Sequence, residues 1–363
     1  MLPDELKTIS GFSGSLMLGR VFNGCGEPID GGSLPEKNID INGTSMDYHL
    51  RAAPSGFIQT GISAIDGLNP MICGQRMPIF SASGLPHNRL AAQIARQAAI
   101  SNKEHENFAV VFAAIGISSE EAFSFMEDFR KTGALNRTIL YINLADDPIA
   151  EHVATPRLAL AAAEHLAFEH GMHVLVILSE ISPACIYTNV MYERAGRLKE
   201  KGSVTQMPIF AMSGGGKSNS VHSLASCAAE GQIVLSRALH SKGIYPPVDA
   251  LASVSRLIDK GIGKENTRED HADLINQLFS AYARGKEAQE LAVINGAFTG
   301  EDNMFAEFSN VFEDKYIRQG EYENRTIKDT LELGWNILTM LPIKEMNRIR
   351  GAYIERYLKP RCQ

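Results

Sequence analysis

Between about residue 75 and residue 212, short apolar runs alternate with longer segments whose apolar residues recur at helical spacing. The runs lie at residues 77–80, 108–115, 138–145, 173–178 and 205–212. Because they are almost continuously apolar, they are typical of strands buried on both faces of a parallel sheet. The segments between them, such as residues 88–101, predict helices that cover the sheet. The pattern therefore predicts an α/β fold built on a mostly parallel sheet with helices on both faces.

The pattern changes on either side of this region. The first 75 residues are rich in glycine and turn residues, and we expect them to wrap the core as short strands and loops. After residue 257 the helical period dominates, and Thr326 with Asp329 has the spacing of an N-terminal helix cap. The sequence thus predicts two domains, residues 1–256 around the sheet and a C-terminal helical domain at residues 257–363.

Composition and charge exclude several classes of protein. The chain of 363 residues has a net charge of −7 and no long basic run, so nucleic acid is not an expected partner. Its five cysteines are scattered without C-x-x-C spacing, which favours reduced thiols in the cytoplasm over a metal site. No apolar run reaches the length of a membrane span, so we expect any membrane association to pass through partners.

Residues 80–91, FSASGLPHNRLA, occupy the place of a phosphate-binding loop. They lie between a predicted strand and a predicted helix, which is the context of the Walker A motif G-x-x-x-x-G-K-[ST]. In that motif backbone N–H groups and the helix N-terminus surround the phosphates, lysine adds charge and Ser/Thr holds Mg²⁺. An ordinary strand-to-helix turn is the alternative interpretation of these residues.

Aligned with the motif, the loop lacks its chemistry. The two glycine positions, the lysine and the Ser/Thr are replaced by Ser81, Pro86, His87 and Asn88, with Gly84 inside the loop. Pro86 has no N–H to donate, and histidine, unlike lysine, is not a fixed cation at neutral pH. From these residues alone, a phosphate loop that lacks its chemistry and an ordinary turn both stay open, and on either interpretation we expect no strongly bound cofactor and no metal site.

Ten stretches, in order along the chain, resemble the B subunit of V/A-type rotary ATPases. They are LGRVFNGCGEPID, QTGISAIDGLNPMICGQRMPIFS, GLPHNRLAAQIARQA, FAVVFAAIG, TPRLALAAAEHLA, HVLVIL, ERAGR, EGQI, IYPPVDAL and YENRTIKDTLELGW. The likeness covers nearly the whole chain. It implies a RecA-like phosphate-loop ATPase core followed by a helical domain, and it identifies the loop as a lost phosphate site. It also implies a non-catalytic subunit rather than an enzyme.

The resemblance implies a set of partners and a location. In this family A and B subunits alternate in a hexameric ring around a central-stalk rotor, with a peripheral stalk, and couple ATP synthesis or hydrolysis to H⁺ or Na⁺ movement. The catalytic sites, with ATP or ADP and Mg²⁺, lie at the interfaces with the A subunit. We therefore expect a cytoplasmic protein, peripheral on the cytoplasmic side of the membrane and attached to it only through the rotor complex.

The resemblance implies a catalytic role for one residue of this chain. Arg256, at the end of DALASVSR, matches the family's arginine that reaches into the neighbouring catalytic site. An arginine supplied in trans stabilises the charge that develops during phosphoryl transfer. The alternative interpretation is a surface arginine that caps a helix or pairs with an acid.

Two acids and two histidines have simpler interpretations. Glu180 follows a strand where a Walker B acid would lie, but it is better interpreted as a carboxylate that ends a strand. Glu121 aligns with the acid that polarises water in the catalytic relatives, yet Ser118-x-x-Glu121 is also a capping box, which we favour. His173 and His271 lack metal-ligand neighbours in sequence and are expected to be structural.

The sequence departs from the family in four places. We expect the N-terminal β-barrel domain to be absent, and the segment after Glu180 is short. Residues 213–232 replace an acidic, proline-containing loop, and Ala252 replaces a proline, which we expect to loosen the approach to Arg256. These departures leave two functions open: a regulatory B subunit, or a degenerate paralogue that acts in binding or assembly without motor function. A stand-alone ATPase is opposed by the loop residues.

Overall fold

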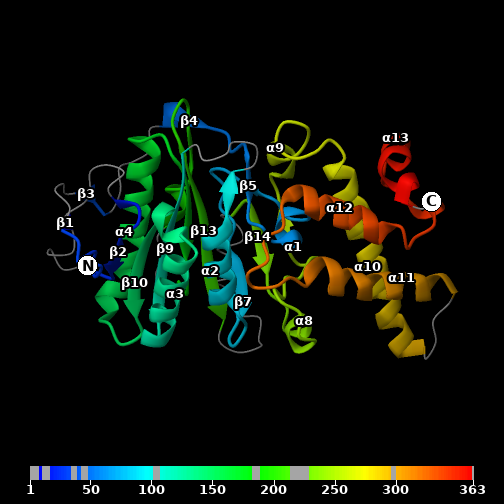
Figure 1. The fold of residues 1–363 in the computed structure, drawn as a ribbon, viewed down its shortest axis with the longest axis horizontal. Coiled ribbons are helices and arrows are strands. Elements are labelled where there is room, and N and C mark those ends of the chain that lie inside the picture. Colours follow the sequence, from blue (N-terminus) through cyan, green and yellow to red (C-terminus); the bar gives the residue numbers. More distant parts are fainter. Residues whose placement is uncertain are drawn as a thin grey trace.

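The computed structural model describes residues 8–9, 17–33, 39–41, 48–100, 107–181, 189–212, 229–295 and 300–361. A sheet flanked by helices lies toward the N-terminal end of the molecule, and a helical region lies toward the C-terminal end (Figure 1). The replaced loop within residues 213–228 and most of the short segment after Glu180 lie outside the described residues.

Among the described residues, the main sheet has ten strands, eight of them along the path β15-β14-β7-β13-β11-β9-β10-β2. These eight are β2 (Val21–Asn23), β7 (Ile79–Ala82), β9 (Phe108–Ile117), β10 (Thr138–Leu144), β11 (His173–Leu178), β13 (Ser203–Met212), β14 (Gly231–Val234) and β15 (Val254–Ser255). The other two are β4 (Arg51–Ala52) and β12 (Gly196–Leu198). From β14 to β2 every pairing along the path is parallel, whereas β15 pairs antiparallel to β14. The mostly parallel sheet predicted from the apolar runs is confirmed.

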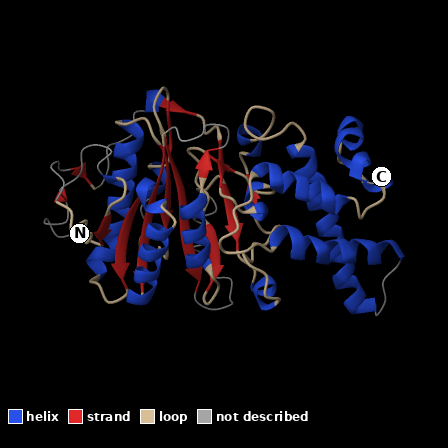
Figure 2. Ribbon diagram, viewed as in Figure 1, coloured by secondary structure: helices blue, strands red, loops and turns tan. Residues whose placement is uncertain are grey.

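Helices cover both faces of the sheet (Figure 2). Successive residues of β9 alternate between two buried clusters, as the two-residue period of a strand requires. Phe112 packs against Phe125 and Phe129 on one face, while Val111 shares the other cluster with Leu166. The covering helices are α2 (His87–Gln97) and α3 (Ser119–Lys131) on the first face and α4 (Ile149–Phe168) on the second.

The helix after the loop is shorter than the sequence predicts. It was expected to extend over residues 88–101, but α2 ends at Gln97, and Ala98 has extended backbone dihedral angles. β8 (Ala99–Ile100) then pairs antiparallel with β5 (Phe57–Gln59), which also pairs with β6 (Met71–Ile72). Pairing with a segment distant in sequence thus overrides the helical period of the last residues.

The C-terminal region is helical, as predicted (Figure 2). Its main elements are α10 (His271–Asn295), α11 (Gly300–Val311), the π-helical η5 (Phe312–Ile317) and α12 (Ile327–Leu338). Thr326 and Asp329 form a capping box at the start of α12. Trp335, Phe308 and Phe312 are fully buried and belong to the same core cluster as α2 and α3. The helical region therefore packs against the sheet domain, where α12 and η5 contact α1 (Ser63–Asp66).

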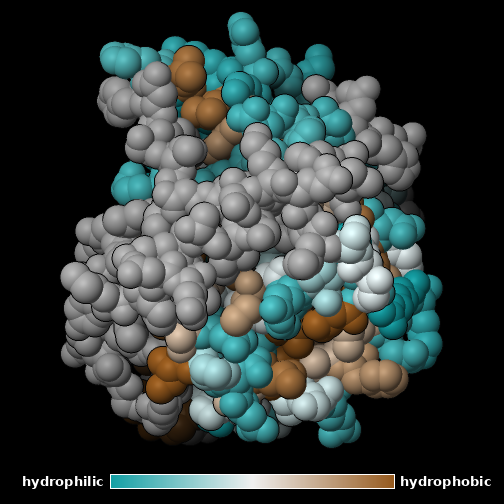
Figure 3. Space-filling model, turned by 90° about the vertical axis from the view of Figure 1, so that its left-hand side faces the viewer, coloured by the Kyte–Doolittle hydropathy of each residue, from teal (hydrophilic) through white to brown (hydrophobic). Residues whose placement is uncertain are grey.

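Short elements complete the described chain. They are α1 (Ser63–Asp66), α6 (Asn189–Glu193), α8 (Arg237–Ser241), α9 (Ile258–Gly261), α13 (Gly351–Tyr353), β1 (Thr8–Ile9), β3 (Ile39–Asp40), η3 (Tyr48–Leu50), η4 (Ala134–Arg137), η6 (Ile343–Glu345), η7 (Ile354–Leu358) and η8 (Lys359–Arg361). Hydrophilic and hydrophobic side chains are interspersed over the described part of the face on the N-terminal side (Figure 3). Within the described ranges, no helix has both the length and the apolar character needed to cross a membrane.

Candidate functional site

The degenerate loop closes on its own chain through His87. This side chain is 6% exposed, and its ring lies between two partners: Nδ1 is 3.1 Å from Ser81 Oγ, and Nε2 is 3.1 Å from Glu180 Oε1. His87 occupies the lysine position of a phosphate loop, but both of its nitrogens are used inside the protein. Gly84, at the turn, has a φ of 80°, which glycine adopts without strain.

The start of α2 offers few groups to an anion. Pro86 occupies the N-cap position and has no N–H, and the N–H of His87 donates to the carbonyl oxygen of Leu85 at 2.9 Å. A phosphate at a helix N-terminus is held by free N–H groups and by fixed positive charge. Here the first N–H is absent and the next is occupied, so neither of these two groups can hold a phosphate at the start of α2.

Glu180 lies at the end of β11 with a left-handed φ of 44°, which is unusual for a residue other than glycine. Its side chain is 40% exposed, and the contact with His87 is its hydrogen bond to the loop. Glu180 therefore lies where a Walker B acid would lie, and its carboxylate bonds the side chain of His87 in the loop. Backbone strain of this kind costs about 1–3 kcal/mol and persists where surrounding contacts fix it.

Glu121 forms the capping box that the sequence predicts. The Ser118 hydroxyl accepts a hydrogen bond from the Glu121 N–H at 3.2 Å, and the Glu121 carboxylate accepts from the Ser118 N–H at 3.3 Å. Glu121 also accepts from the Asn88 amide at 3.4 Å, while Asn88 Oδ1 is buried without a partner among the described residues. The carboxylate is thus occupied in starting α3 and in contacting the loop.

Arg256 lies at the opposite end of the strands from the loop. The loop follows β7, whereas Arg256 follows β15, which pairs antiparallel to β14, and β14 is parallel to β7. The Arg256 N–H donates to the carbonyl oxygen of Glu230, which immediately precedes β14, at 2.9 Å. The structure therefore does not bring Arg256 and the loop together, and Arg256 cannot act on a ligand held by the loop of its own chain.

The Arg256 side chain is exposed, with one hydrogen bond from Nη1 to the carbonyl oxygen of Ala229 at 3.3 Å. Beside it, Arg76 donates to the Glu230 carboxylate from both its backbone N–H and its guanidinium, each at 2.7 Å. Burial lowers the pKa of Arg76, but the Glu230 carboxylate more than offsets this, so the net direction is upward. The Glu230 carboxylate is thereby paired with Arg76.

The turn before Arg256 is held by a side chain. Asp249 Oδ1 accepts hydrogen bonds from the N–H groups of Leu251 and Ala252, each at 3.1 Å. A proline at position 252 could not make the second of these bonds. Ala252 was expected to loosen the approach to Arg256; the structure instead shows its N–H taking part in a side-chain turn.

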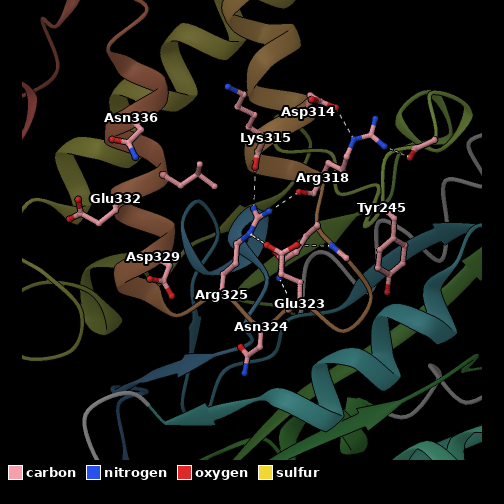
Figure 4. A pocket seen from close by; sticks show the side chains of 14 residues that line it. Tyr245, Asp314, Lys315, Arg318, Glu323, Asn324, Arg325, Asp329, Glu332 and Asn336 are labelled. Carbon is pink, nitrogen blue, oxygen red and sulfur yellow. Dashed lines mark hydrogen bonds and ion pairs between the residues drawn. The ribbon is translucent and has the colours of Figure 1, made fainter. Parts of the chain in front are cut away.

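A cleft of about 960 Å³ lies away from both predicted sites. It opens between η5, α12 and the loop that joins them, with Arg325 at its centre (Figure 4). Arg325 donates to the carbonyl oxygens of Lys315 and Tyr316, each at 3.2 Å, and of Arg318 at 3.0 Å. This arginine caps the end of the π-helical turn, a role that the YENRT motif did not reveal.

Both expected structural histidines have polar contacts inside the protein. His271 is buried, with its ring nitrogens 3.0 Å from Thr267 Oγ1 and 3.3 Å from the carbonyl oxygen of Gly67. Burial lowers the pKa of His271 to about 4. His173 Nδ1 lies 2.8 Å from Ser203 Oγ on the adjacent strand.

Comparison with known proteins places these features in context. Residues 61–189 and 182–255 match the family described as "ATP synthase alpha/beta family, nucleotide-binding domain", and residues 260–358 match the "C-terminal domain of V and A type ATP synthase". The chain is also similar to a solved structure, that of the ATP synthase subunit NeqB from Nanoarcheaum equitans, described as unique. The identity is 35%, the TM-score is 0.80, and the match covers 92% of this chain and 87% of that one.

Proposed function

The chain belongs to the ATP synthase alpha/beta family, with a C-terminal domain of the V and A types, and we propose that it is the non-catalytic, regulatory B subunit of such a complex. The family predicted from the ten sequence stretches is confirmed. The proposed role is to complete the catalytic sites of an A subunit in a ring that couples ATP synthesis or hydrolysis to H⁺ or Na⁺ transport.

The observation that carries this proposal is the separation of two features on one sheet. At the loop end of the sheet, His87 occupies the lysine position of a phosphate loop and is bonded to Ser81 and Glu180 of its own chain. The other end presents an exposed arginine, Arg256, beyond the reach of that loop. A chain that lacks the lysine of a phosphate loop but offers a guanidinium at the far end of the strands is suited to serve a site on a neighbour.

The chemistry proposed for Arg256 is charge stabilisation. A guanidinium placed against the γ-phosphate offsets the negative charge that builds up as the phosphoryl group moves. Among the described residues, the side chain has one bond to leave, that with the Ala229 carbonyl oxygen, to reach a partner. The nucleotide and Mg²⁺ would be held by the A subunit, with none bound strongly by this chain.

The remaining partners follow from the same proposal. They are the central-stalk rotor and peripheral-stalk subunits, and the membrane would be reached only through the rotor complex, on its cytoplasmic side. A second function is assembly or binding without motor activity. This second function is included because the similar subunit NeqB is described as unique. The two functions differ in whether this chain raises the ATPase activity of the A subunit.

The test is reconstitution of the chain with the A subunit of the same complex. Light scattering after size-exclusion chromatography gives the mass of each species, and ATPase is measured on each fraction. We expect ATPase in the mixed species only, and negligible ATP binding to the isolated chain by calorimetry. Micromolar ATP binding, or ATPase by this chain alone, would contradict the proposal. A mixed species without any gain in activity would support the assembly function instead.

A further inference from the structure

Gln75 is a buried amide that joins three segments near Arg256. It is 0% exposed, and Nε2 donates to the carbonyl oxygen of Glu230 at 3.0 Å and to Ser255 Oγ at 3.2 Å. Its Oε1 accepts from the N–H of Ile72 at 3.0 Å. One side chain therefore links the turn before β7, the residue before β14 and the end of β15.

The two groups that receive the Gln75 amide also fix the backbone of Arg256. The Glu230 carbonyl oxygen accepts the N–H of Arg256 at 2.9 Å, so it has two donors. Ser255, the residue before Arg256, is buried and donates its hydroxyl to the carbonyl oxygen of Pro70 at 2.8 Å. The Gln75 amide thus holds both the residue that receives the Arg256 N–H, Glu230, and the residue that precedes Arg256, Ser255.

This anchoring matters because β15 is short. It pairs with β14 through two residues, at the edge of the sheet. Such an edge strand has few ladder bonds to hold it in place. Arg76, next to Gln75, holds residue 230 from the other side, since its carbonyl oxygen accepts the Glu230 N–H at 3.1 Å and its guanidinium binds the carboxylate.

We propose that Gln75 is a positioning residue for Arg256: its amide fixes the register at which the arginine leaves the sheet and faces the neighbouring site. The inference rests on the proposed role of Arg256. It assigns to a buried, uncharged side chain in the GQR stretch a part in the reaction of another subunit. Gln75 touches neither nucleotide nor Mg²⁺, and it acts only through the backbone of residues 230 and 255–256.

The test is a double-mutant cycle in the assembly with the A subunit. Gln75→Met keeps the length of the side chain and removes both donors. We expect it to lower kcat about 10- to 100-fold with little change in KM for ATP, since displacement of a catalytic group by about 1 Å costs this much. In the Arg256→Ala background the same change should have no further effect, because the group that it positions is gone.

Two further variants keep the test decisive. Gln277→Met is the matched control: Gln277 is also a buried amide that bonds two backbone groups, Glu345 O at 3.0 Å and Arg348 N at 3.1 Å, but within the helical region. It should leave kcat unchanged. If Gln75→Met fails to assemble, Ser255→Ala removes one partner of the same amide and should show the same dependence on Arg256.

The outcomes separate this inference from the function on which it rests. An equal loss from Gln75→Met in both backgrounds, or no loss in either, would overturn the positioning role while leaving Arg256 in place. Full activity in the Arg256→Ala assembly would overturn both proposals. A loss confined to the background that retains Arg256 would establish Gln75 as its positioning residue.

Discussion

At the residue scale, the loop in the place of a phosphate loop forms its side-chain hydrogen bonds with groups of its own chain. His87 bonds both Ser81 and Glu180, so both of its ring nitrogens are satisfied within the chain. Comparison with the Walker A motif predicts from Pro86 and His87 that the loop lacks phosphate-binding chemistry, and this stays a prediction. It could not predict that Glu180 would be the partner, because that contact spans 93 residues and depends on the sheet order.

Two buried titratable residues, Asp66 and His271, lie in segments that meet where the sheet domain contacts the helical region. Asp66 is completely buried and accepts hydrogen bonds from Thr60 and Gly61. Burial raises its pKa to about 7, and those hydrogen bonds oppose the rise. His271 contacts the carbonyl oxygen of the next residue, Gly67, and burial lowers its pKa to about 4.

The two shifts predict opposite dependences of stability on pH. Between about pH 4 and 7 the folded protein holds a proton on Asp66 that the unfolded chain has lost, so this carboxyl makes the free energy of unfolding fall as pH rises. Between about pH 4 and 6.5 the unfolded chain protonates His271 while the folded protein does not, so this group makes the free energy rise with pH. In the intact protein the two slopes partly cancel.

Removing either group should expose the slope of the other. We expect Asp66→Asn to make the free energy of unfolding rise more steeply from pH 4 to 6.5, and His271→Asn to make it fall, by up to about 1.4 kcal/mol per pH unit in each case. Urea unfolding at a series of pH values measures this. Parallel profiles for the two variants and the parent chain would contradict the assigned shifts.

At the scale of elements, helix starts were predicted better than helix ends. The capping boxes of α3 and α12 depend on residues three apart, so Ser118 with Glu121 and Thr326 with Asp329 could be recognised in the sequence. The end of α2 depends on the pairing of β8 with β5, which lies about forty residues earlier in the sequence. No local pattern carries that information.

If Glu121 serves only as a helix-capping residue, its substitution should affect stability and not catalysis. Gln can replace Glu in a capping box, so Glu121→Gln should leave both stability and the ATPase of the mixed assembly unchanged. Glu121→Ala should lower the free energy of unfolding by about 0.5–2 kcal/mol without abolishing the ATPase. Thermal unfolding and ATPase assays check both. Loss of ATPase in Glu121→Gln at unchanged stability would mean that the carboxylate acts on a reacting water.

At the scale of the whole molecule, the α/β core and the helical region could be predicted because apolar periodicity reports local structure. The strand order could not, although it has the largest functional consequence. The order and directions of the strands set β14 parallel to β7 and β15 antiparallel to β14, and so put the loop and Arg256 at opposite ends of these strands. The role proposed for Gln75 was equally hidden, since three segments meet at its amide only in the fold.

Because of this arrangement, the proposed role of Arg256 requires two chains, this one and a neighbouring subunit. Arg256, at the far end of the strands, cannot serve the loop of its own chain. In the proposed ring of alternating subunits, that end would lie against a neighbour. The claim is therefore that Arg256 contributes to catalysis in trans.

The most direct test is the ATPase rate of the purified assembly of the A subunit with the Arg256→Ala chain. Arg237→Ala is the matched control, because Arg237 is also exposed and also bonds one carbonyl oxygen, that of Ser83 in the degenerate loop. We expect Arg256→Ala to lower the rate by about 10³-fold or more at unchanged assembly mass, and Arg237→Ala to leave it intact. An Arg256→Ala assembly of the same mass and full activity would contradict the account.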